Sequence, residues 1–113
     1  MTDLEKALNH ITEQIEKYRQ YNHTGDELVE IQKQITATLF YLQKERSDYH
    51  NQFQTLVNRL IIKGDSVSRA TNKAHVEIPE LYMLRKFMDG AYENVWSIKQ
   101  EISWLKTEKS NIN

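Results

Sequence analysis

The sequence predicts an all-α fold: an elongated antiparallel helical hairpin or bundle with coiled-coil character. Apolar residues recur along most of the chain at alternating spacings of three and four, the period of a coiled-coil helix face. Three glycines and one proline in 113 residues are too few for the frequent turns of a sandwich or barrel. The length suits one domain, so we expect a single helical domain over residues 1–113. Its helices are expected at about residues 3–22, 26–63, 66–78 and 79–109.

The first expected helix begins with a recognisable capping signal. Thr2, followed three residues later by Glu5, fits a capping box, which satisfies free amides at a helix start. Gly25 is expected to close the helix by adopting the left-handed conformation. The apolar stripe of this helix comprises Leu4, Leu8, Ile11, Ile15 and Tyr18.

The second expected helix is unusually long. Asp26 or Thr24 is suited to cap its start, and no glycine or proline interrupts it before Gly64. We therefore expect about 37 helical residues, on the order of 55 Å. Arg46 interrupts the stripe; it either pairs across an interface and sets its register, or points into a central opening of an oligomer. The stripe comprises Leu28, Ile31, Ile35, Leu39, Leu42, Arg46, Tyr49, Phe53, Leu56 and Leu60.

The last two expected helices are separated from the long one by a turn. Gly64 begins that turn, and Ser66 or Ser68 is suited to cap the short helix that follows. Pro79 suits the first turn of the last helix. That helix has the most regular stripe, which begins at Leu81. Its expected core or oligomer contacts are Leu84, Met88, Ala91, Val95, Ile98, Ile102 and Leu105.

A slender hairpin leaves much apolar surface uncovered, and self-association would bury it. Several aromatic side chains fall partly off the main stripes, which favours a homo-oligomer. These are Phe40, Tyr41, Tyr82, Phe87, Tyr92, Trp96 and Trp104.

Composition argues against several classes of function. The chain has no cysteine, so it has neither disulfides nor thiolate chemistry, and its four histidines include no pair at the helical metal spacing of four. No carboxylate is isolated in apolar surroundings, as a tuned general acid requires. We expect no catalytic residue, no metal and no cofactor. No apolar run approaches 18 residues and the start has no signal-peptide core, so we expect a cytoplasmic protein outside the membrane.

The net charge of −1 hides a basic central third. Residues 42–73 carry six basic and three acidic side chains. This distribution favours nucleic-acid binding, with Tyr41 and Tyr49 as stacking groups and the helix start near Ser66 as a phosphate contact. The alternative is that the basic residues stabilise helix ends and keep the turn soluble. The expected nucleic-acid-binding residues are Lys44, Arg46, Arg59, Lys63, Arg69 and Lys73.

The last helix resembles the C-terminal helix of the UvsY-type recombination mediators of T-even phages. The resemblance lies in Leu84-Arg85-Lys86-Phe87-Met88-Asp89-Gly90-Ala91 and continues through Val95, Ser97, Ile102 and Leu105. It implies a homo-oligomeric accessory protein that binds single-stranded DNA and helps to load a recombinase onto strands coated by a single-strand-binding protein. The resemblance assigns no function to any individual residue. The nucleic-acid-binding candidates are identified from the charge distribution alone.

Two main functional hypotheses follow, beside a third, an enzyme or ligand-binding helical bundle. The first is an oligomeric phage-type accessory protein that binds single-stranded DNA in recombination or replication. The alternative is a helical protein–protein interaction module, an adaptor or an inhibitor of a host or defence factor, without nucleic-acid binding. Oligonucleotide titration at two salt concentrations separates them.

Overall fold

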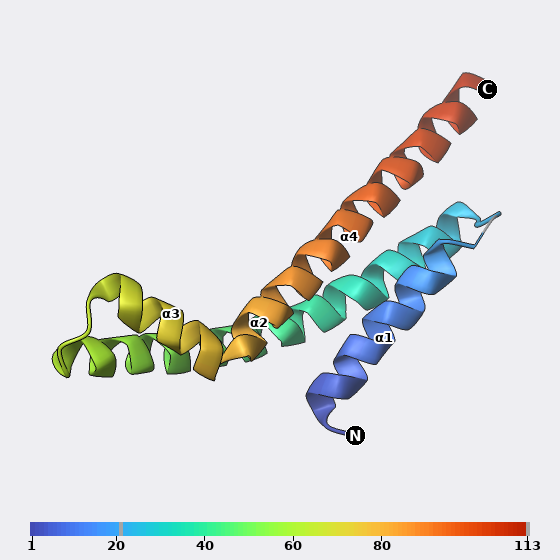
Figure 1. Ribbon diagram of the computed structural model, residues 1–113. Helices are drawn as coiled ribbons and strands as arrows, with labels where there is room; N and C mark the ends of the chain where they lie inside the picture. The colour runs from blue at the N-terminus through green and yellow to red at the C-terminus, as the bar shows by residue number, and fades with distance from the viewer. Residues whose placement is uncertain (21, 113) are drawn as a thin grey trace.

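The computed structural model describes residues 1–20 and 22–112, and their side chains as far as residue 108. Four helices follow one another: α1 (Asp3–Tyr18), α2 (Gly25–Ile62), α3 (Val67–Glu77) and α4 (Pro79–Ile112) (Figure 1). The described residues contain no strand, and the molecule measures 69 × 31 × 19 Å. The prediction of an elongated all-α fold is confirmed.

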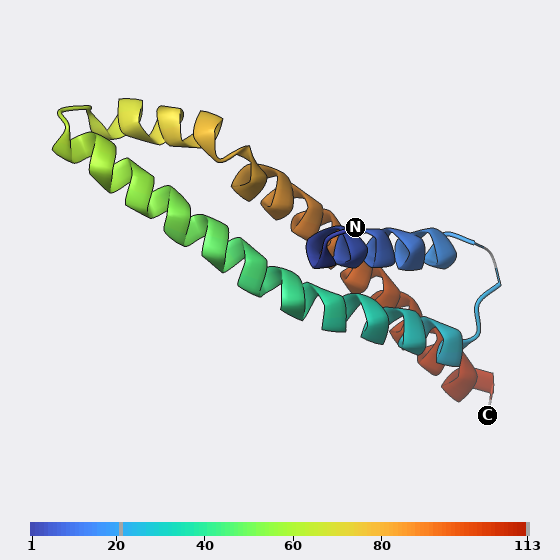
Figure 2. The same ribbon diagram turned by 90° about the horizontal axis from the view of Figure 1, so that it is seen from below.

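Helix α2 runs almost the whole length of the molecule and contacts every other helix. Its N-terminal half packs with α1 and with antiparallel α4, forming a three-helix bundle (Figures 1 and 2). Its C-terminal half packs mainly with α3, forming a two-helix hairpin over residues 49–77, which we call the α2–α3 hairpin, and the first turns of α4 lie against its base. The bundle and the hairpin therefore occupy opposite ends of the rod.

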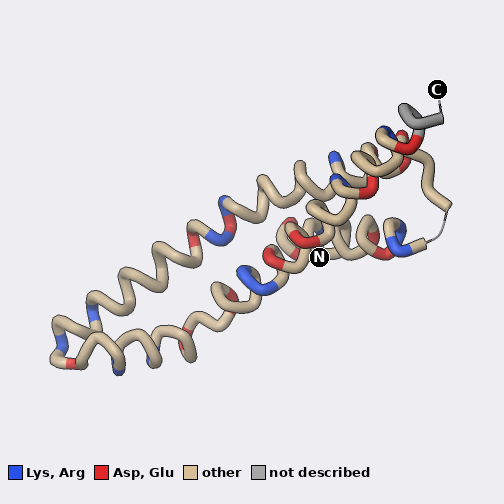
Figure 3. Tube along the Cα trace, turned by 90° about the horizontal axis from the view of Figure 1, so that it is seen from above, with Lys and Arg blue, Asp and Glu red and all other residues tan. Residues whose placement is uncertain are grey.

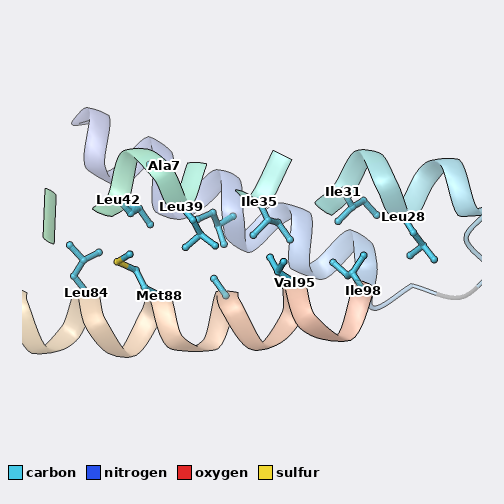
Figure 4. Packing of buried hydrophobic residues seen from close by; sticks show 12 residues of the cluster. Ala7, Leu28, Ile31, Ile35, Leu39, Leu42, Leu84, Met88, Val95 and Ile98 are labelled. Atoms are coloured by element: carbon cyan, nitrogen blue, oxygen red, sulfur yellow. The ribbon is translucent and has the colours of Figure 1, made fainter. Parts of the chain in front are cut away.

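The bundle core lies between the facing stripes of α2 and α4. Ile35 of α2 lies opposite Val95 of α4, and Ile31 lies near Ile98 (Figure 4). Burying a side chain of this size stabilises a fold by about 1.5–3 kcal/mol. The buried members of this core are Ala7, Ile11, Leu28, Ile31, Ile35, Leu39, Leu42, Leu84, Met88, Ala91, Val95 and Ile98.

A second core holds α3 against α2. Phe53 and Val57 of α2 pack with Ala70 and Ala74 of α3, and Leu81 of α4 completes the cluster. The alanine side chains are fully buried, which brings the two helices close together. The ring of His75 also packs on Phe53, with the ring centroids 4.7 Å apart.

The buried face of α2 departs from the expected stripe at this second core. Val57 is buried, whereas the expected Leu56 and Leu60 are only half-buried. An α-helix has 3.6 residues per turn, so a stripe of period 3.5 drifts by about 20° per heptad. Over this long helix the drift moves the buried position from Leu56 to Val57.

Three of the helices begin with a side-chain cap. The hydroxyl of Thr2 accepts a hydrogen bond from the Glu5 amide at 3.1 Å, and that of Thr24 accepts one from the Glu27 amide at 3.1 Å. Ser66 caps α3 in the same way. These hydroxyls satisfy amides that have no partner inside their helices.

The end of α1 differs from the expected one. The helix stops at Tyr18 instead of residue 22, and Asn22, not Gly25, has the left-handed backbone, with φ of 69°. Gly25 is instead the first residue of α2. The reason is local: the His23 ring reaches back to the carbonyl of Lys17 at 2.6 Å and satisfies the end of α1 from outside the helix.

Candidate nucleic-acid interface

Four of the six expected nucleic-acid-binding residues lie on the α2–α3 hairpin. Arg59 lies in the last turn of α2 and Lys63 is the residue that caps its end, while Arg69 and Lys73 stand one turn apart on α3. All four side chains are exposed. We call these four residues the basic face.

Two adjoining shallow grooves show that α2 and α3 present these residues on the same side of the hairpin. Arg59 lines the first groove together with Leu56 and Glu77. Lys73 lines the second groove, which shares Leu56 and Glu77 with the first. Lys63 continues the row of Arg59, and Arg69 continues the row of Lys73, so cations flank this side from both helices.

The charges of the basic face are mostly available to a ligand. Lys73 forms an ion pair with Asp65 in the turn, with the nitrogen and oxygen 2.9 Å apart. Among the side chains that the structure describes, none forms an ion pair with Arg59, Lys63 or Arg69. Because their charges are not neutralised within the chain, these three cations are the ones best able to contact phosphates.

Charge is also separated along the long axis. The α2–α3 hairpin carries four basic and two acidic side chains, whereas the rest of the chain carries 11 basic and 14 acidic ones (Figure 3). The hairpin is therefore positive at one end of a rod whose remainder is negative. A polyanion would be attracted to the hairpin end and repelled from the bundle.

The other two expected residues lie elsewhere. Lys44 is exposed on α2, fifteen residues before Arg59 and thus about 22 Å away along the helix. Arg46 is half-buried in the seam between α2 and α4, in a pocket that it shares with Arg85 and Asp89. The fold therefore brings together four of the six candidates and leaves Lys44 and Arg46 with the bundle.

The two tyrosines expected to stack on bases are packed against the protein core. Tyr41 and Tyr49 are both half-buried and contact the bundle core. Burial and then the neighbouring carboxylate of Glu45 raise the pKa of the Tyr41 phenol. Within the α2–α3 hairpin, every residue of which is described, no fully exposed Tyr, Phe or Trp accompanies the basic face. The basic face therefore carries no exposed aromatic ring, and stacking by Tyr41 and Tyr49, which pack against the core, stays a prediction.

The expected core or oligomer residues of α4 make contacts within the chain. Leu84, Met88, Ala91, Val95 and Ile98 are buried in the bundle, and Ile102 and Leu105 pack half-buried against it. Two of the aromatic residues expected to mediate association, Tyr41 and Phe87, also pack against the core. The others remain exposed: Phe40, Tyr82, Tyr92, Trp96 and Trp104.

The described residues show neither a metal site nor a membrane span. No group of three or more histidine and carboxylate side chains converges within the described part of the chain. None of the helices, over the residues described, has an apolar stretch long enough to cross a membrane.

Comparison with known proteins leaves function to be argued from this chain alone. No protein-family model matches the sequence, and searches of curated proteins and of solved structures give no significant match.

Proposed function

We propose that this protein is an oligomeric, phage-type accessory protein that binds single-stranded DNA through the basic face. The observation that carries the proposal is the gathering of Arg59, Lys63, Arg69 and Lys73 on one side of the α2–α3 hairpin. The separation of charge along the rod supports it, because the hairpin is the positive end.

The physical basis of binding is the release of counterions from phosphates. Each phosphate neutralised on a single strand contributes roughly −0.7 to the slope of log K against log salt. One basic face holds four cations, so the slope for one chain is at most about −3. Such a small set binds weakly alone. Several copies acting on one strand raise the overall affinity by about 10² or more.

The resemblance of α4 to UvsY-type mediators supports single-stranded DNA as the form of nucleic acid and recombination or replication as the setting. A recombinase is then the protein partner. The elongated form is compatible with this role, since the acidic bundle remains free for protein contacts while the hairpin holds the strand.

The test replaces basic-face residues by acidic ones. We expect Lys63→Glu with Arg69→Glu to weaken binding of a labelled oligonucleotide by at least tenfold at about 50 mM salt. The matched control is Lys6→Glu with Lys17→Glu, which makes the same change of charge at exposed positions on α1. Equal losses for the two pairs would mean that net charge, not the basic face, governs binding.

A helical protein–protein interaction module is the second candidate. It is favoured by Trp96 and Trp104, two large side chains that stay about two-thirds exposed. If wild-type protein does not bind oligonucleotide at about 50 mM salt, the protein-partner function takes the place of DNA binding.

A further inference from the structure

Helix α4 carries a second stripe in addition to its buried one. Its members follow one another at spacings of four, three, four, three and four, the coiled-coil pattern again. Arg85 is half-buried and the others are exposed, so nothing in the bundle covers the stripe. The second stripe comprises Arg85, Asp89, Tyr92, Trp96, Lys99 and Ser103.

Two hydrogen bonds place this stripe beside α2. The Gln43 amide donates to the Tyr92 hydroxyl at 2.5 Å, and the Arg85 guanidinium donates to Nδ1 of His50 at 3.1 Å. Both pairs have the same antiparallel register. It follows that the second stripe runs along the edge where α4 meets α2.

This edge is on the side of α2 that α1 does not cover. His10 of α1 is hydrogen-bonded to Gln34 of α2 at 3.1 Å. Gln34 and Gln43 are nine residues apart, which is two and a half helical turns, so they project on opposite sides of α2. Helix α1 therefore covers one side of the α2–α4 pair and leaves the side of the second stripe open.

The open side has the composition of an interface. Phe40 of α2 is 74% exposed, and the register set by Gln43 and Tyr92 places it at about the same level along the rod as Trp96, which is 64% exposed. Residues 34–43 of α2 include no charged side chain. Interface centres are depleted in charge and enriched in aromatic residues.

We propose that this side mediates an antiparallel homodimer, with α4 packed against α4 of a second copy about a two-fold axis at the level of Asn94. The second stripe is symmetric about that residue. Tyr92 and Trp96 lie two residues on either side of it, and Asp89 and Lys99 lie five. In the antiparallel arrangement each Tyr92 meets Trp96 of the second copy, and each Asp89 meets Lys99 of the second copy.

The charge pattern selects a second copy as the occupant. A two-fold interface must complement itself, so an acid on one side of the axis requires a base at the same distance on the other. Asp89 and Lys99 meet that requirement, and Arg85 and Ser103, nine residues from Asn94, add no clash of like charges. A parallel pairing would instead set Asp89 against Asp89, which is unfavourable.

The exposed aromatic side chains on this side supply a large part of the area that a stable dimer interface buries. Tyr92 is 42% exposed, and an aromatic side chain buries about 150–250 Å² when covered. Phe40, Tyr92 and Trp96 together therefore offer about 350 Å² per chain. Two copies bury about 700 Å² of aromatic surface, nearly half of the roughly 1,600 Å² of a standard interface.

The dimer also fixes the distance between two basic faces, which matters for DNA binding if the proposed function holds. The register aligns Asn94 with the level of Tyr41 on α2, and the basic face begins eighteen residues farther along that helix. At 1.5 Å per residue the face lies about 30 Å from the axis. The two basic faces then point away from each other, about 60 Å apart, and a strand long enough to reach both binds with avidity.

A charge exchange tests the dimer in the absence of DNA. We expect wild type to sediment as a dimer at micromolar concentration. Asp89→Lys alone and Lys99→Asp alone each create two pairs of like charges, which should raise the dimer Kd about tenfold or more. The double variant restores both pairs in reversed order, so its Kd should return to within about threefold of wild type.

The matched control is Glu93→Lys, which reverses an exposed charge on α4 outside the second stripe and should leave the dimer Kd unchanged. Circular dichroism establishes that each variant keeps its helices. A monomeric wild type overturns the proposal, as does a double variant no tighter than the weaker single variant. If instead the dimer forms but no oligonucleotide binds, the proposed DNA function fails while the dimer stands.

Discussion

The imidazole of His23 donates a hydrogen bond to the backbone carbonyl of Lys17, with the two atoms 2.6 Å apart, and so caps the last turn of α1 from the connecting loop. Its other ring nitrogen lies 3.1 Å from the carboxylate of Glu27 in the first turn of α2. With both nitrogens facing acceptors, the ring satisfies both contacts only when it is protonated. The interaction joins the end of one helix to the beginning of the next.

This arrangement predicts a pH-dependent stability. The hydrogen bond to Glu27, the largest cause, raises the pKa of His23 above its ordinary value of 6.5. A group with a raised folded pKa contributes stability that is complete below the unfolded pKa and disappears as the pH rises through the folded pKa. We therefore expect the Tm to fall modestly as the pH is raised from about 6 to about 8, as measured by circular dichroism.

His23→Gln is the control for that titration, because glutamine keeps a donor but does not ionise near neutrality. The variant should have a lower Tm than wild type at pH 6, and its pH dependence over the same interval should be smaller. The partner carboxylate acts at lower pH, since the hydrogen bond from His23 lowers the pKa of Glu27. That contribution is present above the unfolded pKa of Glu27 and disappears as the pH falls through the folded value.

The spacing of apolar residues predicts the buried face of a helix well where that face packs on a single neighbouring helix. The stripe of α4 that contains Val95 is buried along most of its length because it packs on α2 in a single register. The position at which α1 ends depends on the side chain of His23, which lies beyond the helix. Sequence rules for helix ends do not predict that contact. Val57 is buried in the second core where Leu56 was expected. The buried face rotates gradually along a long helix, and α3 packs on the side where Val57 lies.

The candidate site was only partly predictable, for a related reason. Lys63 and Arg69 are close in sequence, but their placement on one side of the hairpin depends on how the turn at Gly64, with φ of 113°, aligns α3 with α2. Arg46 belongs to the same basic stretch, yet it projects into the seam between α2 and α4. A charge count ignores the direction in which each helix faces.

A charged residue in the bundle core should strongly destabilise the fold. Val95 is buried opposite Ile35 (Figure 4), and Val95→Asp would place an unpaired carboxylate there. We expect a loss of more than about 3 kcal/mol in the free energy of unfolding, measured by urea denaturation. Met83→Asp, at a position of the same helix that is 66% exposed and outside the second stripe, should cost less than about 1 kcal/mol by the same measurement.

Two tryptophans of α4 provide a matched pair for the dimer. Trp96 belongs to the second stripe, whereas Trp104, 66% exposed, lines a groove on another side of α4 together with Tyr18 and Gln20. We expect Trp96→Ala to raise the dimer Kd by at least tenfold in sedimentation equilibrium, as aromatic anchors at interface centres do. Trp104→Ala should leave that Kd within about threefold; the reverse ranking would place the interface on the other side of α4.

Overpacking between α2 and α3 should separate the two halves of the basic face. Ala74 is fully buried against Phe53 and Val57, so Ala74→Leu adds volume where none is free. We expect a loss of about 1–3 kcal/mol in hairpin stability, seen as faster amide exchange in α3. Oligonucleotide binding should weaken in parallel. Ala37→Leu, at an exposed position of α2, is the control and should change neither quantity.

The salt dependence of DNA binding distinguishes one basic face from two acting together. A strand that contacts a single face neutralises at most four phosphates, which limits the slope of log K against log salt to about −3. A strand that reaches both faces of the antiparallel dimer engages twice as many cations, so the slope should approach about −6. We expect the shallow slope for oligonucleotides of about 10 nucleotides and the steep one for those of about 40, measured by fluorescence anisotropy. Asp89→Lys, which weakens the dimer, should return the long oligonucleotide to the shallow slope while every residue of the basic face remains in place. A slope that stays the same at both lengths would show that one basic face binds alone.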